Sequence, residues 1–122
     1  MPIRDPNQAY QVWADAFNSG DIEAVMALYM PDAIYMAEPG RQVSGKEAIR
    51  AVYTQLVSLK VPITLELLDF AVVGDIAQTR GRWSMRGTSA DGQPVDMGSS
   101  TLAEVLKRQP DGTWLVMIDS AW

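Results

Sequence analysis

The spacing of the apolar residues changes at Pro62, and this change constrains the fold more than any other feature of the chain. Before Pro62 apolar residues recur every three or four positions, which predicts amphipathic helices. After Pro62 they alternate along stretches rich in β-branched residues, which predicts strands. Helices followed by a run of strands are typical of an α+β fold, with the helices on one face of an antiparallel sheet. Because a long twisted sheet curls, we expect a cone-shaped roll that encloses a pocket.

Three segments before Pro62 begin with residues that commonly cap helices. Residues 5–8 (DPNQ) form a capping-box pattern with proline at the first helical position, which predicts a helix that stops at Asn18-Ser19-Gly20. Asp21 is expected to cap a short second helix. Residues 44–47 (SGKE) form another capping box, which predicts a third helix that continues to about Leu59.

The other segments predict strands joined by short turns. We expect Pro31-Asp32 to end the second helix, and Ala33 to Glu38 to form a strand before a turn at Pro39-Gly40. The four longer strands expected after Pro62 are residues 63–73, 76–87, 94–108 (with a bulge at Gly98) and 113–120. The turn signals between them are Gly74-Asp75, Ala90-Asp91-Gly92 and Pro110-Asp111-Gly112. These short connections predict an antiparallel meander, and the length of 122 residues without repeat or linker predicts one domain over residues 1–122.

The charge balance argues against a nucleic-acid partner. The chain has 10 basic and 15 acidic residues, a formal net charge of −5, and no run of Lys or Arg. Such a surface repels a polyanion on average. The N-terminal segment lacks the apolar stretch of a signal peptide, and no apolar run approaches the ~18 residues of a membrane span. We therefore expect a cytoplasmic protein that binds neither nucleic acid nor membranes.

The chain contains no cysteine and no histidine. Without cysteine it can form no disulfide, thiolate nucleophile, Cys-ligated zinc site or iron–sulfur cluster. Without histidine it has no His base, no Ser-His-Asp triad and no His-ligated metal. Acid–base chemistry near neutral pH must then depend on Asp, Glu, Tyr or Lys side chains whose pKa is shifted by their surroundings. We expect no cofactor and no metal.

Four short motifs are spread over nearly the whole chain. They are residues 13–21 (WADAFNSGD), 27–33 (ALYMPDA), 44–50 (SGKEAIR) and 111–114 (DGTW). Together they resemble the nuclear transport factor 2-like superfamily, in its SnoaL-like and ketosteroid isomerase-like branch. The resemblance implies a homodimer formed through the outer face of the sheet, with a separate pocket in each subunit. It does not select an activity, because the superfamily includes isomerases, dehydratases, epoxide hydrolases, cyclases and non-catalytic binding domains.

The resemblance to ketosteroid isomerases weakens at the residues that carry their chemistry. The oxyanion-binding Tyr of those enzymes falls at Trp13, and the nearest match to their oxyanion-binding Asp is Ala103, which has no side-chain donor. Their base falls at Ala37 or, with a one-residue shift, at Glu38. Losing one oxyanion donor typically costs ~10²–10³ in rate. The chain is therefore not expected to be a typical ketosteroid isomerase.

The strongest catalytic candidate is Asp119 on the last predicted strand. The closing motif places Asp119 on the pocket side together with Met117 and Ala121, and burial there would raise the carboxyl pKa into a range suited to a general acid or base. A structural role, such as pairing with Arg80 or Arg82, is the alternative. Tyr53, at a position where the family keeps a tyrosine, or Trp13 would orient a substrate oxygen. Glu38 is either an exposed turn residue or a base at the pocket mouth.

The remaining predictions concern the pocket walls and the ligand. We expect the substrate to contact Trp13, Phe17, Tyr29, Trp83, Met97 and Met117. The arginines at 80 and 82 should face outward, because Trp83 and Met85 then enter the pocket. These features favour a cofactor-independent lyase, isomerase or cyclase that acts on a small apolar or amphipathic molecule. The alternatives are a non-catalytic ligand-binding or dimerisation domain, and an epoxide hydrolase-like enzyme for which Arg82 and Asp119 supply two of three required groups.

Overall fold

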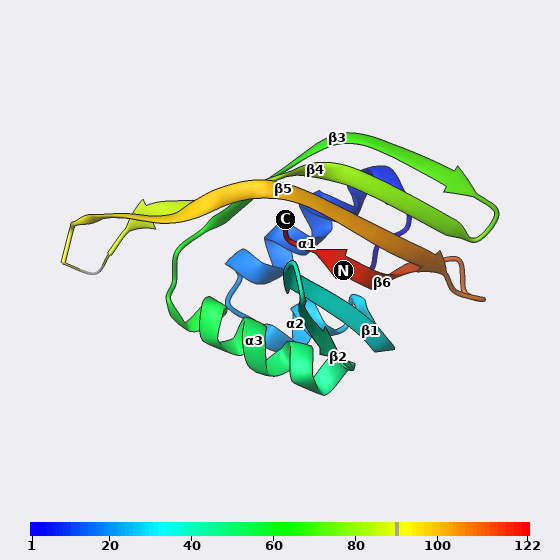
Figure 1. Ribbon diagram of the computed structural model, residues 1–122, viewed down its shortest axis with the longest axis horizontal. Helices are drawn as coiled ribbons and strands as arrows, with labels where there is room; N and C mark the ends of the chain where they lie inside the picture. The colour runs from blue at the N-terminus through cyan, green and yellow to red at the C-terminus, as the bar shows by residue number, and fades with distance from the viewer. Residues whose placement is uncertain (90) are drawn as a thin grey trace.

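The protein folds into a helical layer that packs inside a strongly curved sheet (Figure 1). The computed structural model describes residues 1–89 and 91–122. The helical elements are η1 (Pro6–Gln8, a 3-10 turn), α1 (Ala9–Asn18), α2 (Ile22–Met26) and α3 (Lys46–Ser58). The strands are β1 (Tyr29–Glu38), β2 (Arg41–Ser44), β3 (Ile63–Val73), β4 (Ile76–Thr88), β5 (Pro94–Arg108) and β6 (Trp114–Ser120). The predicted α+β class is therefore confirmed.

The sheet has the strand order β2-β1-β6-β5-β4-β3. Strands β3 to β6 form the predicted antiparallel meander, with bounds within one residue of those expected. The predicted turn at residues 90–92 includes Ala90, which lies outside the described residues. The sheet is mixed rather than purely antiparallel, because β1 pairs in parallel with β6. In Figure 1 the long strands β3, β4 and β5 arch over α1, while β1, β2 and α3 lie below them.

The N-terminal segments differ from the prediction in detail. Asp5 caps the first turn by accepting a hydrogen bond from Asn7 N at 2.9 Å, but that turn is the 3-10 element η1 and Gln8 makes no capping bond. The predicted capping role of Ser44 is wrong, because Ser44 lies in β2 and Gly45, with φ of 91°, precedes α3 instead. Strand β2 itself was not predicted, since its four residues carry no strong alternation.

The second helix is shorter than predicted, and the first strand begins earlier. Helix α2 ends at Met26, and β1 starts at Tyr29 rather than Ala33. Tyr29 pairs with Val116 of β6, and the pairing is interrupted until Ile34 pairs with Ile118. Pro31 lies in this interruption, where its missing N–H costs no ladder hydrogen bond. The proline signal that predicts a helix end thus marks an irregularity inside a strand.

Helix α1 is fixed against the sheet at two points. The Asn18 side chain donates to Ile63 O at 2.9 Å and accepts from Ile63 N at 2.8 Å, which joins the helix end to the start of β3. Tyr10 lies over Gly81 of β4, and its hydroxyl accepts a hydrogen bond from Thr79 Oγ1 at 2.9 Å. A β-carbon at Gly81 would lie 2.3 Å from Tyr10 Cε2, so only glycine fits under this ring.

Met117 forms a bulge that changes which side chains of β6 face inward. Val105 of β5 pairs with Ile118 and Leu106 pairs with Val116, so Met117 is an extra residue without an opposite partner. In a regular strand alternate side chains share a face. With the extra residue, Val116 before the bulge and Asp119 after it both point inward and are buried. The predicted alternation through Met117 is therefore wrong.

The register places four polar side chains in one row across the inner face of the sheet. Tyr35 of β1 pairs with Asp119 of β6, Asp119 pairs with Glu104 of β5, and Glu104 pairs with Thr79 of β4. All four are buried. This row crosses the concave side of the sheet that faces the helices.

Within residues 1–89 and 91–122, no helix combines the length and apolarity that a membrane crossing requires.

Candidate functional site

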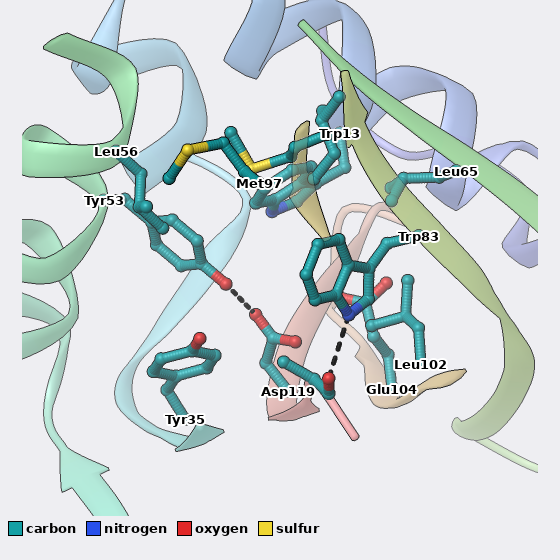
Figure 2. Close-up of a pocket in the computed structure, with 13 residues that line it drawn as sticks. Trp13, Tyr35, Tyr53, Leu56, Leu65, Trp83, Met97, Leu102, Glu104 and Asp119 are labelled. Carbon is teal, nitrogen blue, oxygen red and sulfur yellow. Dashed lines mark hydrogen bonds between the residues drawn. The ribbon is translucent and has the colours of Figure 1, made fainter. Parts of the chain in front are cut away.

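A cavity of about 220 Å³ lies between the helices and the concave face of the sheet (Figure 2). Its aromatic walls are Trp13, Tyr35, Tyr53 and Trp83. Its aliphatic and thioether walls are Leu56, Ile63, Leu65, Met85, Met97, Leu102 and Ala121. Two acidic residues, Glu104 and Asp119, complete the lining. The cavity is below the ~300–1,000 Å³ typical of drug-sized ligands, so it suits a molecule of about one ring.

Asp119 is held in place by two tyrosines from different elements. Tyr29 of β1 donates its hydroxyl hydrogen to Asp119 Oδ2 at 2.6 Å, and Tyr53 of α3 donates to the same oxygen at 2.7 Å. Among the described residues no hydrogen bond reaches the other oxygen, Oδ1. Every fully buried side-chain oxygen of those residues has a hydrogen-bond partner. Because Oδ1 has none, it is not fully buried and is open to the cavity. Figure 2 shows this second oxygen directed away from Tyr53.

Trp13 extends this network to helix α1. Its indole Nε1 donates to the Tyr29 hydroxyl oxygen at 3.0 Å, and Tyr29 then donates to Asp119. The Trp13 ring stacks on Phe17, with ring centroids 5.3 Å apart. Side chains from α1, β1 and α3 thus fix one carboxylate oxygen, which orients the other toward the cavity.

Glu104 is a second buried acid, and its surroundings differ from those of Asp119. Only 4% of Glu104 is exposed, and it lies directly opposite Asp119 in the β5–β6 ladder. No hydrogen bond to its carboxyl group is present among residues 1–89 and 91–122, although its backbone N–H donates to Thr79 Oγ1 at 3.0 Å. Like charges that lie directly opposite across a ladder repel each other. Two adjacent ionised carboxylates are therefore unfavourable here.

The pKa values of both acids are raised. Burial raises the pKa of Glu104 well above its usual range, and the negative charge of Asp119 adds to the effect. Burial also raises the pKa of Asp119, whereas the hydrogen bonds from Tyr29 and Tyr53 oppose that rise. Asp119 is consequently the member of the pair that is better prepared to carry a negative charge.

The tyrosines around the two acids stay protonated near neutral pH. Burial raises the pKa of Tyr29 and of Tyr53 well above the ordinary value, and the Asp119 charge raises both further. Burial is also the main reason why the pKa values of Tyr10 and Tyr35 are raised. All four hydroxyl groups therefore remain hydrogen-bond donors.

Cations are absent from the cavity lining as far as the structure describes the chain. Arg80 and Arg82 are exposed and face outward, as predicted, and Trp83 and Met85 line the cavity. Asp119 therefore pairs with tyrosines rather than with either arginine. The same described part of the chain contains no group of three or more acidic residues arranged to hold a metal ion.

Several predicted site residues lie elsewhere. Glu38 is exposed and forms an ion pair with Arg41 at 3.0 Å, outside the cavity lining. Of the two alternatives for Glu38, the exposed residue at the turn is confirmed and the base at the pocket mouth is wrong, because the Pro39-Gly40 turn carries it to the surface beside β2. Met117 does not line the cavity either, because it is the bulge residue.

The other predicted contacts separate into lining and supporting residues. Trp13, Tyr53, Trp83, Met97 and Asp119 line the cavity, whereas Phe17 and Tyr29 lie behind the lining and support it. Either Tyr53 or Trp13 was expected to orient a substrate oxygen, but the Tyr53 hydroxyl donates to Asp119 and the Trp13 indole donates to Tyr29.

The sequence reasoning missed Glu104 and Tyr35. It assigned the oxyanion position on the penultimate strand to Ala103, but Ala103 pairs with Arg80 and Ser120 on the outer face. Glu104, one residue later, points inward. The alternation of buried Leu102, Glu104 and Leu106 is the signal that could have identified it.

Comparison with a family model covers most of the chain. Residues 10–117 match the SnoaL-like domain. No curated protein matches the chain.

Solved structures share the fold at low sequence identity. A ketosteroid isomerase-like protein from Erwinia carotovora atroseptica is 24% identical, with 93% of this chain and 89% of that chain covered and a TM-score of 0.77. An NTF2-like protein with a cystatin-like fold from Novosphingobium aromaticivorans is 20% identical, with 95% and 79% covered and a TM-score of 0.78. A proposed dehydratase of the NTF2-like family from Streptomyces avermitilis is 20% identical, with 93% and 89% covered and a TM-score of 0.76. At these identities the likeness shows the fold alone.

Proposed function

The chain belongs to the SnoaL-like domain family, and on that premise we propose that it is a cofactor-independent lyase, isomerase or cyclase in which Asp119 transfers protons. Its substrate is a small, mostly apolar molecule of about one ring, in keeping with the apolar walls and the 220 Å³ volume of the cavity. The substrate contacts Trp13, Trp83 and Met97 among the lining residues.

The observation that carries the proposal is the unequal environment of the two Asp119 oxygens. Oδ2 accepts hydrogen bonds from Tyr29 and Tyr53, while Oδ1 faces the cavity without a partner among the described residues. A base needs an oriented lone pair within reach of the proton that it removes. The two tyrosines and Trp13 are positioning residues, because they fix the direction of Oδ1 without contacting the substrate through their donors.

The environment of Asp119 also suits proton transfer near neutral pH. Burial raises its pKa from the ordinary aspartate range, and the two tyrosine hydrogen bonds limit the rise. Oδ1 would take a proton from a substrate carbon activated by a neighbouring carbonyl. The proton returns at another carbon in an isomerisation, or leaves with a hydroxyl group as water in a dehydration.

Deuterium exchange tests this proposal without knowledge of the natural substrate. Ketones of one ring, 4-methylcyclohexanone and N-methyl-4-piperidone, would be incubated with the protein in D₂O, and α-hydrogen exchange followed by NMR. The wild type should accelerate exchange of at least one ketone. Asp119→Asn should lower the acceleration by about 10²–10⁴, which is the usual contribution of a general base.

Glu38→Gln is the matched control, because it makes the same carboxyl-to-amide change at an exposed residue outside the cavity. It should leave the exchange rate unchanged. Equal rates for the wild type and Asp119→Asn would overturn the catalytic assignment and leave a non-catalytic binding domain as the function of this fold.

We further propose that the protein forms a cytoplasmic homodimer through the outer face of its sheet. Ala103, Val105 and Ile118 present apolar side chains there and remain partly exposed in one chain. A second copy would cover them. The absence of cysteine fits a reducing compartment.

A further inference from the structure

Glu104 is buried as a residue, but its carboxyl oxygens open onto the cavity and receive no hydrogen bond from the described residues. It is 4% exposed, lines the cavity, and has no hydrogen bond to its carboxyl oxygens within residues 1–89 and 91–122. Asp119, directly opposite, receives two tyrosine hydrogen bonds, so only one member of the pair is satisfied by the protein. Buried acids are usually paired or hydrogen-bonded, because an unpaired buried charge is costly.

The described residues that line the cavity place no positively charged side chain against the two acids. The titratable groups that face Glu104 and Asp119 are the phenols of Tyr10 and Tyr29, Tyr35 and Tyr53, from α1, β1 and α3. These groups carry no positive charge at any pH. The five ion pairs of the described residues all involve arginines outside the cavity lining.

The walls beside the acids favour an organic cation. Trp13, Trp83, Tyr35 and Tyr53 line the same space, and aromatic side chains attract ammonium groups. The rest of the wall is aliphatic, which suits the hydrocarbon part of an amine. An anionic ligand would meet two acids and no cation among the described lining residues, and the cavity should exclude it.

We infer that the cavity binds a small organic amine as its ammonium ion, with the positive charge against Glu104 and the hydrocarbon ring between the aromatic walls. This inference rests on the proposed function, because it specifies the class of molecule that the cavity takes. Without a ligand, Glu104 holds a proton because burial raises its pKa, and it would release that proton to solvent when the ammonium group pairs with it. Asp119 Oδ1 would remain available for proton transfer.

Three probes of similar size and different charge test the inference. Cyclohexylamine, cyclohexanol and cyclohexanecarboxylate would be titrated at pH 7, with binding followed by the fluorescence of the tryptophans and by ligand-observed NMR. Trp13 and Trp83 line the cavity and should report its occupation. The ammonium ion should bind at least about tenfold more tightly than the alcohol, as expected for a desolvated charge pair, and the carboxylate should not bind.

Glu104→Gln keeps the shape of the side chain and removes the carboxyl group that would ionise when the ammonium group binds. It should weaken cyclohexylamine binding by about tenfold or more and leave cyclohexanol binding within about twofold of the wild type. Glu66→Gln is the matched control, since Glu66 is exposed on β3 and the substitution makes the same carboxyl-to-amide change. It should change neither affinity. If Glu104→Gln does not fold, the preference of the wild type among the three probes still decides the question.

The outcomes separate this inference from the proposed function. Equal binding of the amine and the alcohol, or binding of the alcohol alone, would overturn the ammonium assignment and leave the cavity as a site for neutral molecules. Equal amine affinity for the wild type and Glu104→Gln would also overturn it. Binding of none of the three probes would contradict both the ammonium assignment and the ligand-binding cavity.

Discussion

Glu104→Gln should make the free energy of unfolding less dependent on pH, and should stabilise the protein in alkaline solution. In the folded protein burial raises the pKa of Glu104, followed in importance by the charge of Asp119. In the unfolded chain a glutamate has a pKa of about 4.3. Between these two pKa values the folded state holds a proton that the unfolded state has lost.

The sign of the effect follows from this difference. An acid whose pKa is raised in the folded state contributes stability below its unfolded pKa, and this contribution is lost as the pH rises through its folded pKa. Each extra proton held by the folded state lowers the free energy of unfolding by ~1.4 kcal/mol per pH unit. Glutamine stays neutral at every pH. The free energy of unfolding of the variant should therefore fall less steeply with rising pH than that of the wild type.

The assay is urea unfolding at pH 5, 6, 7 and 8, followed by tryptophan fluorescence. At pH 5 the two proteins should have similar stability, because Glu104 is protonated and nearly isosteric with glutamine. The variant should gain on the wild type by up to ~1.4 kcal/mol for each pH unit above that. Asp96 and Asp111 are exposed, and their pKa values are lowered in the folded protein. They therefore reduce the free energy of unfolding only as the pH falls below this range.

Glu66→Gln serves as the control, because it removes an exposed acid and should reproduce the slope of the wild type. Parallel curves for the wild type and Glu104→Gln over the four pH values would refute the reasoning. That result would mean that Glu104 is ionised in the folded protein throughout this range.

Two further predictions concern packing and assembly. Gly81→Ala should destabilise the protein by about 1–3 kcal/mol in urea unfolding. The reason is that the new β-carbon would lie 2.2 Å from the Glu66 carbonyl oxygen and 2.3 Å from Tyr10 Cε2. A loss of stability below about 0.5 kcal/mol would contradict this close packing. Sedimentation at micromolar concentration should show a dimer for the wild type and a monomer for Val105→Glu. The substitution places a charge on the outer face of β5, opposite Ile118. A monomeric wild type would refute the shared-sheet interface.

Local signals in the sequence predict most of the helices and strands correctly. The change of apolar spacing at Pro62 separates the helices from the four strands β3 to β6, and the turn residues around Gly74 and Gly112 place the adjoining ends of these strands within one residue. Such signals depend on neighbours in the chain. They fail where pairing between distant segments decides the structure, as for β2 and for Tyr29, which the pattern assigns to a helix.

The site is predicted less completely, because register decides which side chains meet. Asp119 is identified as an inward carboxylate, but through an alternation that the bulge at Met117 breaks. The same one-residue uncertainty on β5 led to Ala103 instead of Glu104. A bulge or a shift of one residue reverses the face of every later side chain, and the local sequence contains little information about either.

The sequence by itself determined the α+β class, the long strands and the absence of any histidine or cysteine chemistry, because composition and local periodicity are properties of the chain alone. Only the tertiary structure decided that Tyr29, Tyr53 and Asp119 meet at one oxygen, and that Glu104 lies beside them without a partner. These groups come from β1, α3, β6 and β5, and their contacts depend on the parallel pairing of β1 with β6 and on one bulge. The free energy of those long-range contacts, rather than any local preference, sets the geometry of the cavity.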